Sequence, residues 1–289
     1  MRRSLAFVLV AGLIATVRAQ ELKLPMKEGS VRFAILGDAG TGGSAQRRVA
    51  RRLAATHAIY PFEFVLMLGD NLYGSENSAD YARKFETPYK PLLDAGVKFY
   101  AALGNHDDPS QAFYKPFNMD GKRYYSFKAP NGSVRFFALD SNYMQQEQLT
   151  WLEKELAASG SDWKIAFFHH PLYSSGERHG SDEKLREQLE PLFVKHGMEV
   201  VFTGHEHFYE RLKPQKNIHY IISGAAAKLR RGNIGDSGLT AKGYDQGYTF
   251  VIVEIAGDDM HFQTLTDRGE TVDSGVIRRQ AEETARAVK

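Results

Sequence analysis

The stretch FVLMLGDNLYG, residues 64–74, is an apolar run that ends abruptly in a polar cluster. Gly69, Asp70 and Asn71 follow the run directly, and Tyr73 stands three positions after the aspartate. A short apolar run with such a boundary predicts a buried strand whose end carries a carboxylate to the edge of a sheet. The chemical reason for a tyrosine at this place comes from the rest of the sequence.

Similar apolar runs alternate with amphipathic stretches along the chain, which predicts an α/β core. Strands are expected near residues 31–37, 63–68, 97–103, 163–169, 199–203 and 218–223. Helices are expected near residues 44–58, 78–94, 145–158 and 182–196. Two antiparallel hairpins are also expected, one around a turn at residues 130–133 and one within residues 247–266.

The chain has 289 residues, of which 43% are hydrophobic, so it can bury a sizeable core. It contains no repeat, no low-complexity tract and no linker rich in proline and serine. We therefore expect one domain over residues 30–270, with an N-terminal extension at residues 20–29 and a charged C-terminal tail at residues 271–289.

Residues 1–19 have the pattern of a secretory signal peptide. A basic start at Arg2 and Arg3 precedes an apolar stretch over residues 5–17, and a small-residue cleavage site ends at Ala19. A membrane-spanning helix needs about 20 apolar residues, and no later stretch supplies them. The expected location is therefore the periplasm or the outside of the cell, between which the sequence does not decide.

The charge and the cysteine content exclude several classes of site. Removal of residues 1–19 would take away three arginines and no acidic residue, which changes the formal net charge from +2 to −1. Such a chain gives no indication of nucleic-acid binding. Because the sequence has no cysteine, any metal ligands must come from Asp, Asn, His, Tyr or Glu, which suit hard or borderline cations.

Five polar clusters follow the ends of five predicted strands. They are residues 37–40, 69–73, 104–107, 169–171 and 204–207. In an α/β sheet the loops beyond the carboxyl ends of the strands converge on one crevice, so these clusters can meet although they are far apart in the sequence. Together they offer two aspartates, a tyrosine, an asparagine and several histidines, a set that suits two metal ions.

These clusters resemble the motifs of the calcineurin-like metallophosphoesterases, and within them the small purple acid phosphatases of the tartrate-resistant type. The family pattern runs D-x-G, G-D-x-x-Y, G-N-H-D/E, a histidine on a later strand, and G-H-x-H, and all five stand in this order within residues 30–266. The resemblance implies a four-layer α/β/β/α sandwich with a dinuclear metal site at the carboxyl ends of the strands. It also implies an acid phosphatase that hydrolyses small phosphomonoesters by attack of a metal-activated hydroxide.

The resemblance also explains Tyr73. In many relatives the first motif is D-x-H, whose histidine binds the first metal, whereas Gly40 stands at that position here. Tyr73 would restore the number of ligands. A phenol with an ordinary pKa of about 10 loses its proton at neutral or acid pH only beside a strongly charged ion, so Fe(III) is the natural candidate.

The family roles, transferred residue by residue, imply two ligand sets that share Asp70 as a bridge. The ferric ion would be held by Asp38, Asp70, Tyr73 and His207. The second ion, a divalent Fe, Zn or Mn, would be held by Asp70, Asn105, His169 and His205. The ligand types do not decide which divalent metal is bound.

His169 is assigned as a ligand in preference to His170, because the family places its ligand two residues before a proline, here Pro171. Neighbouring residues on a strand also face opposite sides. His170 is therefore expected to have a structural or supporting role.

Two further histidines are expected to face the substrate. His106 follows the ligand Asn105 and would point toward the phosphate, with Asp107 as a candidate to orient it. By similarity to the family, His179 would protonate the leaving alkoxide. Because His179 stands in a loop with little motif around it, an unrelated surface histidine is the alternative there.

Several alternatives come from the same residues. Residues 40–45 match the G-x-G-x-x-A form of a dinucleotide-binding turn, but an oxidoreductase would leave four clusters unexplained. Residues 131–133 are formally a glycosylation acceptor and are interpreted as a hairpin turn. A non-catalytic protein with this fold would lack a metal ligand, and none is missing.

Within the enzymes, a phosphodiesterase or nucleotidase with the same metals is the alternative, because the motifs report the phosphoryl site and not the leaving group. The sequence does not decide the oligomeric state or the physiological substrate.

Overall fold

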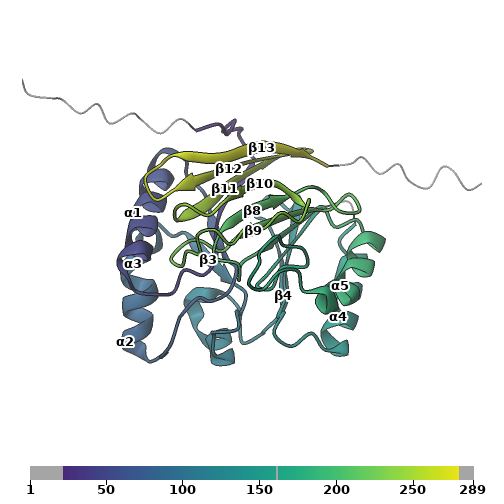
Figure 1. Cartoon of the computed structure of the whole chain (residues 1–289), viewed down its shortest axis with the longest axis horizontal. Helices are drawn as coiled ribbons and strands as arrows, with labels where there is room; N and C mark the ends of the chain where they lie inside the picture. Colours follow the sequence, from purple (N-terminus) through teal and green to yellow (C-terminus); the bar gives the residue numbers. More distant parts are fainter. Residues whose placement is uncertain (1–21, 161, 280–289) are drawn as a thin grey trace, which may run out of the picture.

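Two β-sheets pack face to face, and helices cover the outer side of each sheet (Figure 1). This computed structural model describes residues 22–160 and 162–279. The strand order is β13-β12-β11-β1-β2-β3 in the first sheet and β10-β8-β9-β7-β6-β5-β4 in the second. The four layers confirm the predicted α/β/β/α sandwich.

The predicted signal peptide at residues 1–19 lies outside the described residues. Within residues 22–160 and 162–279, we find no helix with the length and apolar character that crossing a membrane requires.

The first sheet joins three parallel strands to an antiparallel group at the C-terminal end of the chain. Its strands are β1 (Val31–Leu36), β2 (Phe64–Met67), β3 (Lys98–Ala101), β11 (Thr249–Ala256), β12 (Asp259–Thr266) and β13 (Thr271–Arg278). β1, β2 and β3 pair in parallel, as expected, and all four residues of β2 are buried. β11 and β12 form the expected antiparallel pair.

The second sheet has a parallel centre with antiparallel edges. Its strands are β4 (Tyr125–Lys128), β5 (Val134–Ala138), β6 (Trp163–Phe168), β7 (Val200–Thr203), β8 (Tyr209–Leu212), β9 (His219–Ser223) and β10 (Thr240–Tyr244). The strands β5, β6, β7 and β9 run parallel, and β4 pairs with β5 as the predicted hairpin. In the turn of this hairpin, Asn131 Oδ1 accepts a hydrogen bond from the Ser133 amide at 3.0 Å.

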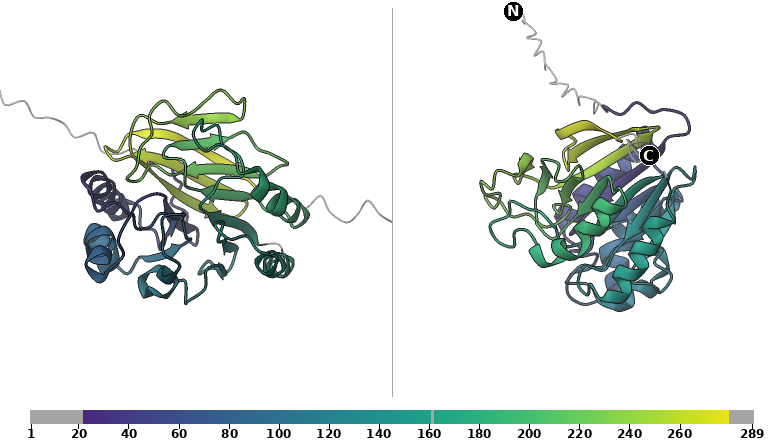
Figure 2. Two further views of the ribbon diagram at one scale, coloured as in Figure 1. Left: turned by 60° about the horizontal axis from the view of Figure 1, so that its bottom comes forward. Right: turned by 90° about the vertical axis from the view of Figure 1, so that its right-hand side faces the viewer.

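Helices form the two outer layers (Figures 1 and 2). α1 (Ser44–Ile59), α2 (Ser78–Tyr81) and α3 (Thr87–Asp94) cover the first sheet, and α4 (Gln146–Ala157) and α5 (Glu183–Lys195) cover the second. Two short 3₁₀ helices, η2 (Pro109–Phe113) and η3 (Lys115–Phe117), follow β3.

The helix expected near residues 78–94 is interrupted by a π-helical turn, η1 (Ala82–Glu86). Pro88 has no N–H to give to the carbonyl of Lys84, four residues earlier, so a regular helix is not favoured here. That carbonyl accepts a hydrogen bond from Nε2 of Gln46 in α1, at 2.5 Å. The wide turn thus ties the α2–α3 segment to the first helix.

Phe33 connects the two sheets in the core. Its ring stacks on Phe64 of the same sheet, with centroids 5.2 Å apart, and meets Phe136 and Phe202 of the second sheet edge to face. Such aromatic pairs favour one relative orientation of the two sheets. Because the polar clusters come from both sheets, this packing also sets their separation.

The expected tail at residues 271–289 is wrong for its first part, because residues 271–278 form the edge strand β13. β13 pairs antiparallel with β12 from Asp259 to Leu265, and Ile277 is buried. Because of Arg278 and Arg279, the sequence of this segment predicts a charged tail. Its pairing supplies partners to backbone groups of β12 that would otherwise form an exposed edge.

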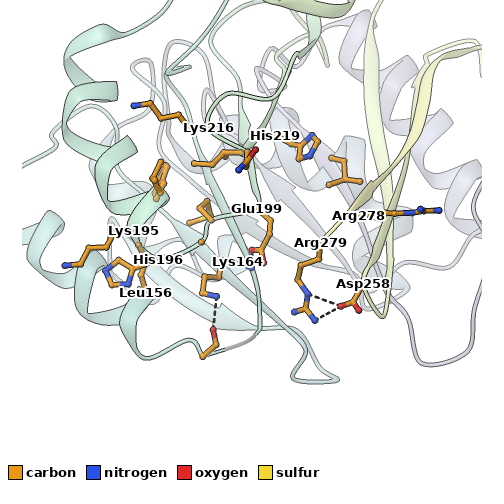
Figure 3. Close-up of a pocket in the computed structure, with 18 of the residues that line it drawn as sticks. Leu156, Lys164, Lys195, His196, Glu199, Lys216, His219, Asp258, Arg278 and Arg279 are labelled. Carbon is orange, nitrogen blue, oxygen red and sulfur yellow. Dashed lines mark hydrogen bonds and ion pairs between the residues drawn. The ribbon is translucent and has the colours of Figure 1, made fainter. Parts of the chain in front are cut away.

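A hollow of about 1170 Å³ opens at the amino ends of β6, β7 and β9 (Figure 3). Glu199 precedes β7 there, and its carboxylate accepts a hydrogen bond from the Lys164 amide at 2.6 Å. Arg279 pairs with Asp258 on another side of the hollow, at 2.6 Å. Burial raises the pKa of the Glu199 carboxyl to about 7.

We predict that Glu199→Gln makes stability less dependent on pH. In the folded protein the Glu199 carboxyl keeps its proton up to a pKa of about 7, whereas in the unfolded chain it ionises near its ordinary value of 4.5. Its contribution to stability is therefore present below about pH 4.5 and is lost as the pH rises to about 7. Denaturant titrations across this range should show a loss about 3 kcal/mol larger in the wild type than in the variant.

Glu187→Gln on the exposed side of α5 is the control, and it should keep the wild-type dependence on pH. If Glu199→Gln also loses stability with pH as the wild type does, the buried carboxyl is not the cause.

Candidate metal centre

The polar clusters begin with residues in an unfavourable backbone conformation. Asp38, Asp70 and His205 have positive φ angles of 57°, 52° and 66°, in the left-handed region that residues with a side chain rarely adopt. Each follows a glycine in the turn at the carboxyl end of a strand, β1, β2 or β7. Backbone strain of this kind concentrates at functional sites, so these three turns indicate one.

Gly69 makes room for the neighbouring cluster. Its φ is +90°, and a Cβ atom there would lie 2.6 Å from Nδ1 of His169. A side chain at this position would therefore displace the histidine and strain the turn before Asp70.

One group of donor atoms gathers around Asp38. The Tyr73 hydroxyl donates a hydrogen bond to Asp38 Oδ1 at 3.0 Å and lies 3.4 Å from His207 Nε2. The distance from His207 Nε2 to Asp38 Oδ1 is 3.3 Å. One ligand atom each from Asp38, Asp70 and His207 lie within 4.8 Å of one another, which is a spacing that a metal ion can bridge.

A second group gathers around Asn105. Its Oδ1 lies 3.0 Å from His169 Nε2 and 3.1 Å from His205 Nδ1, and these two nitrogens are 3.2 Å apart. His169 Nδ1 donates its proton to the carbonyl of Leu68 at 2.9 Å, so its Nε2 presents a lone pair to the group. Asp70 Oδ1 is 3.5 Å from His169 Nε2, which places Asp70 between the two groups.

The electrostatics of the two groups fit a bound cation. Asp38 and Asp70 are buried, and within the described part of the chain their only ion pairs are with histidines. Burial raises the pKa of Asp38 well above its usual value. Burial and the nearby charges of Asp38 and Asp70 also raise the pKa of the Tyr73 phenol. Burial also lowers the pKa of His207, to about 4.

No lysine or arginine among the described residues forms an ion pair with Asp38 or Asp70. Two carboxylates, a phenol, an amide oxygen and imidazole lone pairs converge instead, and this chemistry fits hard or borderline metal ions. All seven predicted ligand positions are thus brought into these two groups: Asp38, Asp70, Tyr73, Asn105, His169, His205 and His207.

The two predicted substrate-facing histidines lie on different sides of the cluster. His106 is exposed, and its ring centroid is 4.9 Å from that of Tyr73. Its backbone amide donates to Asp70 Oδ1 at 3.0 Å. His179 is also exposed, and its ring centroid is 4.3 Å from that of His205. A substrate bound over both groups would have one histidine on each side.

Asp107 does not orient His106, contrary to expectation. Its carboxylate accepts hydrogen bonds from the amides of Asn71, Leu72 and Gly104, at 3.1, 3.0 and 2.8 Å. It therefore fastens the loop after β3 to the loop after β2, and burial with the nearby charge of Asp70 raises its pKa to about 8. The sequence could not indicate this, because three of the partners of Asp107 are backbone amides.

His170 has a different environment from His169. Its Nδ1 lies 2.8 Å from Ser141 Oγ, and its ring centroid is 4.5 Å from that of His205. One of its nitrogens also lies within 4.8 Å of ligand atoms of His169 and His205, so distance alone does not separate it from a ligand. Its supporting role stays a prediction.

The loop geometry gives the physical reason for a glycine at position 40. A Cβ atom on Gly40 would lie 1.9 Å from the carbonyl oxygen of Asn71. The Gly40 amide donates to the Asp70 carbonyl at 3.2 Å, and the Gly40 carbonyl accepts from the Tyr73 amide at 2.9 Å. The turn that leaves no room for a side chain at position 40 therefore also holds the backbone of Tyr73.

Two features of the site have no motif in the sequence. The ammonium group of Lys228 lies 4.4 Å from the centroid of the Tyr73 ring, on the side of the loop after β9. The carboxylate of Glu206 is fully buried and pairs with Arg230 at 3.2 Å. The partners of Lys228 and Glu206 are far from them in the sequence, so no local motif predicts these contacts. The basic residues that follow Ala227 are the one pattern that could have drawn attention to this segment.

Comparisons with known proteins agree with this geometry. The sequence model of the calcineurin-like phosphoesterase family matches residues 31–209. The chain is 30% identical to tartrate-resistant acid phosphatase type 5 of Homo sapiens over 251 residues, which cover 71% of this chain and 77% of that protein. It is 25% identical to purple acid phosphatase 7 of Arabidopsis thaliana over 304 residues, which cover 88% and 92%.

A solved structure of GAP50, described as the anchor in the inner membrane complex of Plasmodium, is similar with a TM-score of 0.75. The two sequences are 18% identical, and the match covers 88% of this chain and 90% of that one. At this identity the similarity concerns the fold alone.

We predict that Gly40→Ala weakens metal binding without unfolding the protein. The added methyl group must displace the Asn71 carbonyl, and this moves Asp70 and Tyr73 away from Asp38. Gly43→Ala is a matched control in the same turn, because its Cβ would lie 3.4 Å from Thr41 Oγ1 and meet nothing closer. Metal content after dialysis should fall at least about tenfold for Gly40→Ala only, with circular dichroism unchanged. Equal metal content in the two variants would contradict the steric argument.

Proposed function

We propose that this protein is an exported acid phosphatase for small phosphomonoesters. The premise is that the chain belongs to the calcineurin-like phosphoesterase family and is a metal-dependent phosphatase. The observation that carries the proposal is the convergence of seven donor side chains around two buried carboxylates. Family membership removes the oxidoreductase interpretation of residues 40–45. The proposal of export depends on the pattern of residues 1–19, and the proposed phosphoesterase domain begins near residue 30 and includes β13.

The proposed centre contains Fe(III) and a divalent ion. Asp38, Asp70, Tyr73 and His207 would hold Fe(III), and Asp70, Asn105, His169 and His205 would hold Fe, Zn or Mn. Bound there, the two ions would supply an acidified water molecule and positive charge for the phosphate oxygens. Asn105 would ligate through a neutral amide oxygen, which would leave less negative charge around the divalent ion than around the ferric ion.

The choice of Fe(III) rests on Tyr73. Burial and the carboxylates of Asp38 and Asp70 raise the pKa of the phenol, so the protein itself disfavours the phenolate. A strongly charged ion reverses this preference, and a ferric ion does so more strongly than a divalent one. Tyr73 would therefore be a ligand only to the more highly charged metal.

The two exposed histidines have separate proposed tasks. His106 would donate a hydrogen bond to a phosphate oxygen, because it follows Asn105 and its ring lies next to that of Tyr73. His179 gives a proton to the leaving oxygen from the side of His205. A phosphodiesterase with the same site is the second candidate, since nothing in the donor set distinguishes the number of ester groups on phosphorus.

We predict that the purified protein hydrolyses phenyl phosphate faster than bis-phenyl phosphate at mildly acid pH. Asp70→Ala should lose both metals and all activity, because it removes the proposed bridge. His106→Ala should keep both metals and lose rate by roughly 10²–10⁴, the usual effect of one group that contacts the substrate. Kinetics and elemental analysis of the same samples provide the measurement.

Faster hydrolysis of the diester would favour the second candidate. A metal-free His106→Ala protein would mean that His106 belongs to the metal ligands.

We predict that the iron-loaded, oxidised protein is pink to purple. A phenolate bound to ferric iron can transfer electron density to the metal when it absorbs visible light, whereas zinc or magnesium centres are colourless. Tyr73→Phe keeps the ring and removes only the hydroxyl oxygen, so it should abolish the visible band and leave the fold intact. The band should follow iron content across preparations. An iron-loaded wild type without a visible band would refute phenolate ligation.

A further inference from the structure

Glu206 stands between two proposed metal ligands in the sequence, but its carboxylate binds other partners. The residue is fully buried. Its Oε1 accepts a hydrogen bond from the Gly180 amide at 2.9 Å, and its Oε2 lies 3.2 Å from Nη1 of Arg230. A buried carboxylate needs such partners, so both contacts hold Glu206 in one orientation.

The contact with Gly180 fixes the loop that carries His179. This loop, residues 174–180, also contacts residues 233–235: the Glu177 amide donates to the Asn233 carbonyl at 2.9 Å, and the Gly235 amide donates to the Ser175 carbonyl at 2.7 Å. Gly176 lies directly against Glu206, because a Cβ there would be 2.2 Å from Oε1. The loop therefore packs directly against the Glu206 carboxylate, which fixes its position.

The contact with Arg230 links the Glu206 carboxylate to the metal centre. The Arg230 amide donates to the carbonyl of His207 at 3.0 Å, while its guanidinium binds Glu206. Glu206 itself is bonded through the backbone to His205 and His207. One side chain thus fixes the position of an exposed histidine relative to two residues of the proposed ligand sets.

We propose that Glu206 is the positioning residue that holds His179 against the leaving group of the substrate. The inference rests on the proposed phosphatase function. In the reaction, the oxygen of water forms a bond to phosphorus and releases one proton to solvent, and the bond from phosphorus to the leaving oxygen breaks. The leaving oxygen keeps the electron pair and takes a proton from His179, which gives an alcohol and inorganic phosphate. The imidazole then regains its proton from solvent.

The dependence of the rate on the leaving group distinguishes the positioning of His179 from a purely structural role of Glu206. A p-nitrophenolate leaves without a proton, whereas an alkoxide needs one. A mispositioned His179 therefore slows alkyl phosphates much more than p-nitrophenyl phosphate. General loosening of the site slows both substrates by the same factor.

Glu206→Gln is the main test. The amide keeps the shape of the side chain, but its NH₂ group must face either the Gly180 N–H or Arg230, and both are donors. We expect kcat/KM for glycerol phosphate to fall about 100-fold, and kcat/KM for p-nitrophenyl phosphate to fall less than about threefold. Both metals should remain by elemental analysis. His179→Asn should show the same dependence on the leaving group.

The double variant Glu206→Gln/His179→Asn separates a joint action from two independent ones. If Glu206 acts through His179, the double variant is no slower on glycerol phosphate than His179→Asn alone. Gly176→Ala displaces the same loop in a different way, because its methyl group pushes the loop away from an intact Glu206. This variant keeps the test decisive if Glu206→Gln fails to fold. Glu254→Gln is the matched control: Glu254 is fully buried and accepts two backbone hydrogen bonds, from Met26 and Lys27, in the first sheet.

Several results would overturn the inference. They are an equal loss on both substrates in Glu206→Gln and Gly176→Ala, additive losses in the double variant, or a His179→Asn protein with no dependence on the leaving group. A wild type without activity on either substrate would refute the proposed phosphatase function itself, and this outcome is distinct from the other three.

Discussion

The buried pair of carboxylates, Asp38 and Asp70, is the constraint around which the rest of the molecule is arranged. Each lies at the carboxyl end of a parallel strand, and neither has a lysine or arginine partner among the described residues. Burial of two like charges is unfavourable unless a positive charge compensates for it. The surrounding side chains offer hydrogen bonds and lone pairs instead, so the compensation falls to a bound cation.

This constraint explains why the turns after the strands are strained and rich in glycine. A sharp reversal directly after β1, β2 and β7 brings Asp38, Asp70 and His205 to the same edge, at the cost of positive φ angles. The contact of Gly40 with Asn71 is so close that no side chain fits, and the Gly40 carbonyl accepts a hydrogen bond from the Tyr73 amide in the same turn. Asp107 then fixes the loop after β2 to the loop after β3 through backbone hydrogen bonds.

The sequence was sufficient to predict the features that depend on local pattern. Apolar runs predict the strands, and the polar residues that end them predict the metal donors, because parallel strands end at one edge. Features that depend on partners far along the chain were not predictable: the support that Glu206 gives to the loop at Gly180, the position of Lys228 over Tyr73, and the role of Asp107. β13 was missed for a similar reason, since its partner strand β12 lies outside its own sequence.

The donor atoms come from both sheets and from positions as distant as 38 and 207, and this has a consequence for the order of events during synthesis. The amide of His205, after β7 of the second sheet, donates to Asp38 Oδ2, after β1 of the first, at 2.9 Å. No N-terminal fragment that ends before residue 207 contains the whole donor set, so the centre assembles only when both sheets have formed and packed together. The ions that complete the centre would then bind late, after most of the chain has folded.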